Sequence, residues 1–307
     1  MLSLSPCNLC PRLCHARRER APGACGCGET VRVARAGLHF WEEPCLSGTR
    51  GSGAVFFSGC TLRCRFCQNA KVSLGGWGRE VSGERLAEIF LELQEQGAHN
   101  VNLVTATQYV PQVIAALARA KSGLQESGLQ KPGLKIPVVY NCGGYERVET
   151  VRALKGSVDI FLPDLKYCDE TLSARYAGAP DYIKAASEAV REMVAQAGPP
   201  VYDGEGMLQS GVIVRHLVLP GARRDSIRLL RWMEKNLPKG GFLLSLMSQY
   251  TPYRRDPDYP VLNRRLTTFE YRSVVEEACR LGLTDGYMQE RTSAREEYTP
   301  PFDGTGV

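Results

Sequence analysis

The chain has 307 residues, which is long for an ordinary single domain but suits one α/β barrel with an attached segment. Its hydrophobic share of 43% and charged share of 23% exclude disordered and collagen-like proteins. The net charge of +5 at pH 7 is too small to indicate a nucleic-acid partner. No apolar run approaches the roughly 20 residues of a membrane helix, and residues 1–6 lack a secretion signal. We therefore expect a cytoplasmic protein without a membrane partner.

From residue 51 onward, short β-branched or aromatic runs alternate with helical stretches. The predicted strands span residues 54–58, 101–105, 136–141, 158–165, 212–219, 242–248 and 286–289. The predicted helices span residues 84–96, 111–121, 146–154, 181–196, 225–236 and 269–281. This alternation indicates βαβ units and a parallel sheet. The predicted fold is α/β, a partial or full (β/α) barrel of about six to seven βα units, with an open sheet as the alternative.

In such barrels the chemistry takes place on the loops that follow the strands. Polar or thiol residues stand at the ends of the first six predicted strands, and they form the candidate active site. In strand order these positions are Cys60, 105–107, 141–144, 164–166, 215–216 and 248–250.

Cysteine is the most informative residue type in this sequence. Of the twelve cysteines, eight fall in two short clusters, which favours metal binding in a reducing compartment over six disulfides. Residues 1–50 hold six cysteines and few periodic apolar positions. We therefore divide the chain into a Cys-rich, metal-stabilised N-terminal extension (1–50) and a barrel (51–307).

Cys60, Cys64 and Cys67 follow the first predicted strand, separated by three and two residues. Three thiolates with this spacing can each bind one iron of a cubane iron–sulfur cluster. The fourth iron then lacks a nearby protein ligand, which suits a site that binds a small molecule directly. A zinc knuckle is the alternative, but this spacing without a close fourth Cys or His is a poor zinc pattern.

This Cys-x3-Cys-x-aromatic-Cys run after the first strand resembles the radical S-adenosylmethionine (SAM) superfamily, from about residue 50 to the C-terminus. Three segments resemble the pyruvate formate-lyase activating enzyme branch: Cys-Gln-Asn at 67–69, Val-Asp-Ile-Phe-Leu-Pro-Asp-Leu-Lys at 158–166 and Arg-His-Leu-Val-Leu-Pro-Gly at 215–221. The Cys-rich leader, residues 39–44 and residues 56–60 are similar to the uncharacterised activating-enzyme-like proteins of that branch.

The resemblance implies a [4Fe–4S] cluster on Cys60, Cys64 and Cys67, whose open iron chelates SAM. One electron then cleaves SAM, and the 5′-deoxyadenosyl radical takes a hydrogen atom from the substrate. The cofactor supplies this chemistry, while the protein positions the substrate and excludes water and oxygen. The positions that the resemblance places near SAM are Phe66, Asn69, Asp164, Lys166 and Arg215.

For some of these residues an alternative stays open. Asp164 and Lys166 could form a structural ion pair at a strand end. Arg215 matches a position that pairs with the SAM carboxylate, a contact that suits a guanidinium fork, but it too could be structural. His216 points to the opposite face from Arg215 by strand alternation and is expected to be packed.

One departure from the family pattern concerns the second strand. The branch usually carries Gly-Gly-Glu there, to hold the SAM amino group, whereas this chain reads Val-Thr-Ala-Thr-Gln at 104–108. The hydroxyl of Thr105 or the amide of Gln108 could accept from an ammonium, but without the charge. Asn141 contacts the cofactor or substrate, or else belongs to a tight turn.

The extension supplies four thiols at Cys7, Cys10, Cys14 and Cys25. Four thiolates suffice for a zinc site or a second iron–sulfur cluster, and a third outcome is that no metal binds. The alternatives also cover the ligand set, because Cys27 or Cys45 could replace one of the four.

The remaining motifs have a structural interpretation beside a functional one. Cys142, Cys168 and Cys279 are expected to be buried structural thiols. His39 and the Glu42–Glu43 pair form either a lid over the cluster or a segment packed against the leader. Arginine pairs at 223–224, 254–255 and 264–265 are expected to be solvated, with an acidic protein partner as the alternative.

Three functions are consistent with these observations. The first is a radical SAM enzyme that acts on a protein or peptide, with a glycyl radical enzyme as candidate partner substrate. The second keeps the radical chemistry but acts on a small metabolite or nucleoside. The third is a zinc-stabilised RNA-binding or scaffold protein without catalysis. For the enzymes, a flavodoxin or ferredoxin is the expected electron donor.

Overall fold

One long sheet organises the computed structural model, which describes residues 2–126, 129–130, 132–253, 255–290 and 299–307. Its parallel strands follow one another along the sheet in sequence order, each hydrogen-bonded to the next. They are β2 (Ser52–Phe57), β4 (Val101–Val104), β7 (Val138–Cys142), β8 (Ile160–Pro163), β10 (Leu208–Leu217), β11 (Leu243–Met247) and β12 (Gly286–Met288). Each predicted strand therefore has its counterpart, with ends shifted by a few residues.

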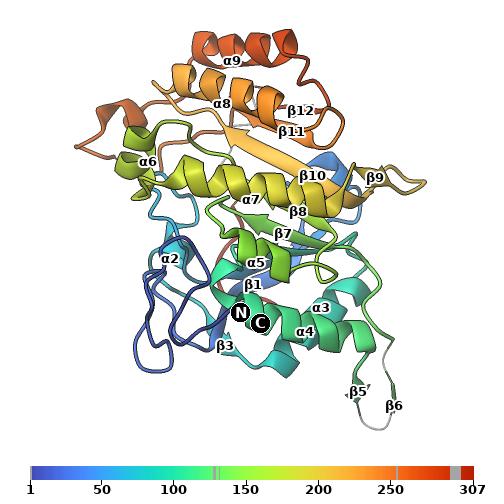
Figure 1. The fold of residues 1–307 in the computed structure, drawn as a ribbon. Coiled ribbons are helices and arrows are strands. Elements are labelled where there is room, and N and C mark those ends of the chain that lie inside the picture. The colour runs from blue at the N-terminus through green and yellow to red at the C-terminus, as the bar shows by residue number, and fades with distance from the viewer. Residues whose placement is uncertain (1, 127–128, 131, 254, 291–298) are drawn as a thin grey trace.

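The predicted helices connect these strands and cover the outer face of the sheet (Figure 1). They are α3 (Gly83–Glu95), α4 (Val110–Ser122), α5 (Val148–Ala153), α7 (Tyr182–Ala197), α8 (Arg223–Asn236) and α9 (Thr268–Arg280). In α7 the buried residues Ala186, Val190 and Met193 recur at helical spacing and form the face that packs on the sheet. Among the described residues the end strand β12 pairs only with β11, so the predicted α/β fold is confirmed as a partial (β/α) barrel.

Two antiparallel strands extend the sheet beyond β2, and the sequence did not predict them. They are β1 (Val31–His39), which pairs with β2, and β3 (Arg79–Val81), which pairs with β1. The C-terminal segment also lies along β1, where the amides of Ala36 and Gly304 bond across the two segments. The residues of β1, which lie before position 50, thus belong to the same sheet as the barrel strands. The division of the chain at residue 50 into two domains remains a prediction.

The loop after β1 crosses the end of the barrel where the parallel strands begin. It contains the short helix α1 (Pro44–Ser47), blue in Figure 1 beside the start of β10. The Asn100 side-chain amide donates to the Leu46 carbonyl at 2.8 Å and fixes the loop to the start of β4. Cys45 and Leu46 pack among the side chains of Val139, Ile160, Leu162, Leu208, Ile213 and Leu243. This helix therefore forms the floor of the barrel.

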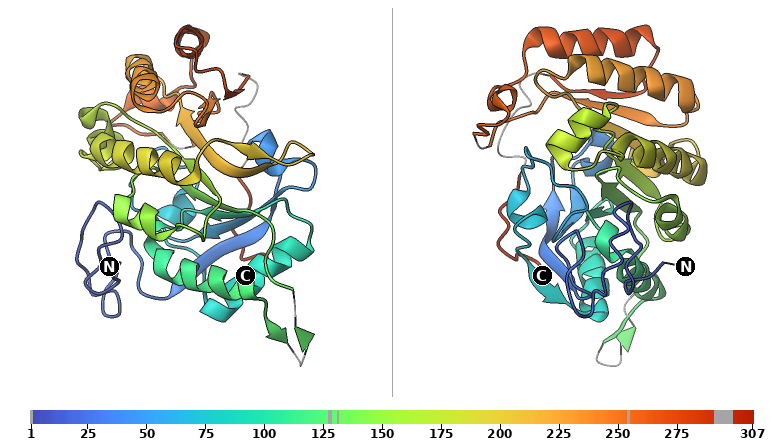
Figure 2. Two further views of the ribbon diagram at one scale, coloured as in Figure 1. Left: turned by 45° about the vertical axis from the view of Figure 1, so that its right-hand side comes forward. Right: turned by 60° about the vertical axis from the view of Figure 1, so that its left-hand side comes forward.

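The cysteine-rich leader, residues 2–30, lies at the opposite end of the strands (dark blue in Figures 1 and 2). Its backbone is held by side chains of the barrel: Thr150 donates to the Leu9 carbonyl at 2.6 Å, and Arg147 donates to the Asn8 carbonyl at 2.5 Å. The remaining short elements are α2 (Ala70–Ser73), β5 (Gln125–Glu126), β6 (Leu129–Gln130), α6 (Glu170–Ala177), β9 (Val201–Tyr202) and the 3₁₀ turns Thr107–Tyr109 and Pro260–Asn263. Within the described ranges, no helix has the length and apolarity needed to span a membrane.

Candidate active site

The loop that carries Cys60, Cys64 and Cys67 leaves the carboxyl end of β2 and ends at α2. Two of its backbone amides, those of Arg63 and Arg65, donate to carbonyls of α6 at 2.9 and 2.8 Å. The Arg65 guanidinium also donates to Asp256 at 3.0 Å, which ties the loop to the C-terminal half of the barrel. The loop that holds the three thiols is therefore fixed from several sides.

The three thiols line one cavity of about 290 Å³ inside the barrel. Burial raises the pKa of Cys60 to about 11 and that of Cys64 to about 12, although the nearby Lys166 ammonium lowers the latter. A bound metal removes such protons, because thiolates are the ligating form. The other predicted residues that line this cavity are Phe66, Asn69, Thr105, Asn141, Asp164, Lys166 and Arg215.

A charged network occupies the middle of the cavity. Arg215 on β10 donates to Asp164 at 2.9 Å, to Asn141 at 2.6 Å and to Glu42 at 3.1 Å. Lys166 donates to the second oxygen of Asp164 at 2.6 Å. Burial alone would raise the pKa of Asp164, but the two cations lower it below the usual value. The ion pair expected at the end of β8 is present, and it faces the cavity.

Glu42 also belongs to this network, a position that neither of its two predicted roles anticipated. It accepts from Asn102 at 3.0 Å and from Asn141 at 3.3 Å, in addition to the Arg215 ion pair. The prediction of a lid over the cluster is wrong, because β1 is antiparallel to β2 and His39 therefore pairs with the first residue of β2. Glu42 thus reaches the cavity from its floor, at the end away from the three thiols.

The segment that replaces Gly-Gly-Glu has an unusual backbone. Thr105 lines the cavity with a φ of 61°, a left-handed conformation that a β-branched residue rarely adopts. Gln108 does not line the cavity but donates to the carbonyls of Ser58, Gly59 and Thr105 at 2.9, 3.2 and 2.7 Å. The loop thus keeps a conformation suited to glycine, and Gln108 fixes the backbone just before Cys60 instead of facing a ligand.

The structure places the remaining predicted residues as follows. The Phe66 ring packs edge-on against Tyr250, with centroids 5.9 Å apart, and Asn69 is the N-cap residue of α2; their contacts with the cofactor remain predictions. His216 is buried and hydrogen-bonded to the Leu165 carbonyl at 2.7 Å, on the side away from Arg215 as strand alternation predicts. Of the three expected structural thiols, Cys142 is buried and Cys168 half-buried, whereas the prediction for Cys279 is wrong because it lies exposed on α9.

A family model described as "Radical SAM superfamily" matches residues 54–207, half of this chain. The chain belongs to the radical SAM superfamily. Over 285 residues it is 28% identical to the "Uncharacterized protein MJ0674" of Methanocaldococcus jannaschii, covering 90% of this chain and 75% of that protein. Members of the superfamily use a [4Fe–4S] cluster and SAM, while the activating-enzyme branch remains a prediction.

Solved structures to which the chain is similar include SuiB from Streptococcus suis and HydG, a maturase of the [FeFe]-hydrogenase. SuiB has a TM-score of 0.48 and 14% identity and is matched over 76% of this chain and 47% of its own. HydG has a TM-score of 0.45 and 10% identity over 74% of this chain and 48% of its own. This radical SAM chain therefore spans about half the length of these two structures.

The leader of this radical SAM chain gathers its cysteines behind the triad loop. The sulfurs of Cys14 and Cys25 both lie beside Gly23. Cys10 is close enough to Cys7 and Cys25 for their charges to add to the effect of burial, which raises its pKa to about 12. The pKa of Cys25 falls to about 6, chiefly through a hydrogen bond with Cys27. Cys45 lies apart from them in the floor of the barrel, so of the two spare thiols only Cys27 is near the predicted four.

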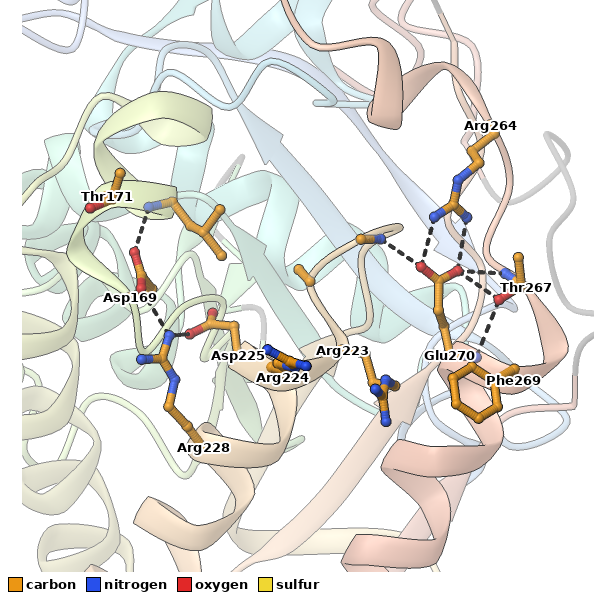
Figure 3. A pocket seen from close by; sticks show the side chains of 13 residues that line it. Asp169, Thr171, Arg223, Arg224, Asp225, Arg228, Arg264, Thr267, Phe269 and Glu270 are labelled. Carbon is orange, nitrogen blue, oxygen red and sulfur yellow. Dashed lines mark hydrogen bonds and ion pairs between the residues drawn. The ribbon is translucent and has the colours of Figure 1, made fainter.

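A second, more open pocket lies outside the cavity, between α6, α8 and α9 (Figure 3). It contains arginines from two of the basic pairs, whereas Arg254 of the third pair lies outside the described residues. Arg264 donates to both oxygens of Glu270 at 2.7 and 2.8 Å, and Arg228 bridges Asp169 and Asp225 at 2.9 and 3.1 Å. No cysteine lines this pocket, so it is separate from the triad cavity.

Proposed function

We propose that Cys60, Cys64 and Cys67 hold a [4Fe–4S] cluster whose fourth iron binds SAM beside Arg215 and Lys166. The observation that carries this proposal is that three thiols, a guanidinium and an ammonium line one cavity. In the described part of the chain, no three Cys, His, Asp or Glu side chains are arranged around a single metal ion. The separation of the three thiols is compatible with a cubane cluster, because each thiolate binds a different iron and the sulfurs need not meet at one point.

When bound, the cluster and SAM supply a 5′-deoxyadenosyl radical that takes a hydrogen atom from the substrate. The chain's own residues bind and orient. Arg215 donates three of its five N–H groups to Asp164, Asn141 and Glu42, and the remaining two can donate to the SAM carboxylate. Lys166 adds a second cation on the same side, and Phe66 offers a ring face for the adenine. The floor formed by α1 excludes water from the opposite end.

We propose that the hydrogen atom is taken from a protein or peptide substrate, in particular a glycyl radical enzyme. A flavodoxin or ferredoxin is the proposed electron donor. The resemblance of residues 158–166 and 215–221 to the activating-enzyme branch supports this assignment. A small-molecule substrate is the second candidate, because the closed floor and its buried carboxylates favour a ligand that enters the barrel. We do not propose the RNA-binding or scaffold function, since the triad is intact within a radical SAM chain.

The test is anaerobic SAM cleavage. The reconstituted protein is mixed with dithionite and SAM, and 5′-deoxyadenosine is quantified beside a triple Cys60, Cys64 and Cys67→Ala variant. Product from wild type alone is the expected result. Equal silence from both proteins, with zinc in each, would overturn the proposal. A glycyl radical signal after addition of a glycyl radical enzyme would separate the first substrate from the second.

We also propose that Cys7, Cys10, Cys14 and Cys25 bind a second metal site, either an auxiliary iron–sulfur cluster or zinc. The Cys25 carbonyl accepts from the amide of Cys60 at 3.4 Å, so such a cluster would lie directly behind the triad loop. Elemental analysis is expected to find less metal per chain in a Cys7→Ala variant than in wild type, by the content of one site. Cys279→Ala, which changes an exposed thiol, is the control. A Cys7→Ala variant that retained the full complement would contradict the second site.

A further inference from the structure

Among the described residues, the lining of the cavity holds one more carboxylate than it holds cations. Its charged lining residues are the cations Lys166 and Arg215 and the carboxylates Glu42, Glu43 and Asp164. Arg215 and Lys166 neutralise Asp164 and Glu42 through the network described above. Glu43 is left over. His39 also lines the cavity, but burial lowers its pKa to about 4 and keeps it neutral near pH 7.

The Glu43 carboxylate is buried and only partly hydrogen-bonded. The residue is 8% exposed, and one of its oxygens has no hydrogen-bond partner among the described residues. Burial raises the pKa of Glu43, and the neighbouring Glu42 charge raises it further, while Arg215 lowers it. A buried carboxylate in this condition is costly, and natural proteins normally provide a partner for it. The missing partner is therefore expected to come from a ligand.

Glu43 lies on the side of the cavity away from the three thiols and beside Arg215, whose register partner on β11 is Ser245. The Ser245 hydroxyl of β11 bonds to Glu43 and lowers its pKa, whereas the triad follows β2 near the other end of the row of parallel strands. An oxidised cluster with three thiolates carries one net negative charge and SAM one net positive charge, so loading both leaves the surplus of Glu43 unchanged. The partner of Glu43 is therefore a group of the substrate.

Resting on the proposed function, we infer that Glu43 binds a cationic nitrogen of the substrate, an alkylammonium or guanidinium group. Such a group supplies both the missing charge and the missing donors, and a charge-assisted hydrogen bond is the strong form of this contact. The carbon chain of the substrate would then extend from the floor toward the thiols. The same chemistry is offered by a free amine and by a lysine or arginine side chain of a protein substrate.

The experiment measures binding to the cluster-reconstituted protein saturated with S-adenosylhomocysteine, by calorimetry. Pentylamine and 1-pentanol are the probes, since they match in length and differ in charge. We expect pentylamine to bind wild type and to bind Glu43→Gln at least about tenfold more weakly, and pentanol not to distinguish the two proteins. Glu205→Gln is the control, because it removes an exposed surface carboxylate. Equal pentylamine affinity for wild type and Glu43→Gln would overturn the inference.

Two further measurements exclude other roles of Glu43. If Glu43→Gln weakened S-adenosylhomocysteine about tenfold and left pentylamine unaffected, Glu43 would serve the cofactor ammonium and the inference would fail. The melting temperature of Glu43→Gln at pH 8 is expected to be no lower than that of wild type, whereas Glu42→Gln, which loses the Arg215 pair, melts lower. A fall in both variants would reveal a structural partner for Glu43 and overturn the inference.

A pair of peptides distinguishes a free amine from a protein side chain as the ligand of Glu43. A blocked Gly-Lys-Gly peptide that binds more tightly than pentylamine, with its norleucine analogue inactive, would support a protein side chain as the ligand. Weaker binding of the lysine peptide would support a small amine. These measurements need no radical chemistry, so silence of wild type and the triple variant with zinc in each would overturn the proposed function without deciding the role of Glu43.

Discussion

The interior cavity and the open pocket of Figure 3 are both lined by arginines and carboxylates, but their charges are balanced differently. In the open pocket each carboxylate has its cation: Glu270 has Arg264, and Asp169 and Asp225 share Arg228. In the cavity, Glu43 has no cation of its own among the residues that the structure describes. The two regions therefore differ in how their buried charges are matched, and on this difference we assign a ligand to the interior cavity.

Solvent explains why the two regions differ. The Arg264 and Arg228 side chains are 42% and 52% exposed, whereas Arg215 is 14% exposed. In the open pocket the Asp225 and Glu270 carboxylates are buried, but their arginine partners remain in contact with water, which screens these ion pairs. Inside the barrel the same charges interact in a low dielectric, so a missing partner is costly and a correct ligand is strongly recognised.

The largest effect is expected at Asp164, the shared acceptor of the cavity. Asp164→Asn leaves Arg215 and Lys166 without their common carboxylate and is expected to cost about 3–5 kcal/mol of unfolding free energy. Denaturant unfolding measures this cost. Glu84→Gln, which breaks an exposed pair with Arg119, is the control and should leave the unfolding midpoint unchanged. Equal effects of the two variants would remove the distinction between buried and screened charges.

A pH dependence is expected from Glu146, which is buried behind the cavity and bonded by Thr107 and Tyr140 at 2.6 and 3.2 Å. Burial raises its pKa from 4.5 to about 8, so its neutral form stabilises the fold and that stability is lost as the pH rises toward 8. Glu146→Gln stays neutral. Between pH 6 and 9 it should lose about 2–3 kcal/mol less than wild type in urea unfolding. Parallel pH profiles of wild type and variant would contradict this, and Glu149→Gln on the exposed face of α5 is the control.

The smallest effect is expected in the open pocket. Glu270 caps α9 by accepting from Thr267, and it also accepts from the Gly221 amide at 2.7 Å. Glu270→Gln should cost about 1–2 kcal/mol of unfolding free energy, because it weakens the cap and the Gly221 bond, while the Arg264 cation that loses its partner is 42% exposed and stays hydrated. The affinity for S-adenosylhomocysteine should not change. A tenfold loss of that affinity would make the pocket part of the active site and would break the comparison between the two regions.

Much of the site was predictable because its residues are close in sequence or follow strands. Cys60, Cys64 and Cys67 lie within one loop, so their spacing alone indicated the cluster. Parallel strands place their carboxyl ends at one edge, which brought Asp164 and Arg215 together as expected. Glu42 was misplaced because its position depends on the antiparallel pairing of β1, a strand whose pattern of buried and half-buried residues does not alternate regularly.

By itself, the sequence determined the order of the parallel strands and the main helices and the family, and it predicts the thiol donors for the cluster. Those features depend on local periodicity and on short spacings, which the chain carries wherever it folds. Only the tertiary structure decided which charges meet. The α1 loop turns back under the barrel because Cys45 and Leu46 fill its apolar floor. This packing places Glu42 against Arg215, whereas Glu43 meets no cation of its own in the described part of the chain. Such pairings depend on contacts between distant segments, so no local pattern could specify them.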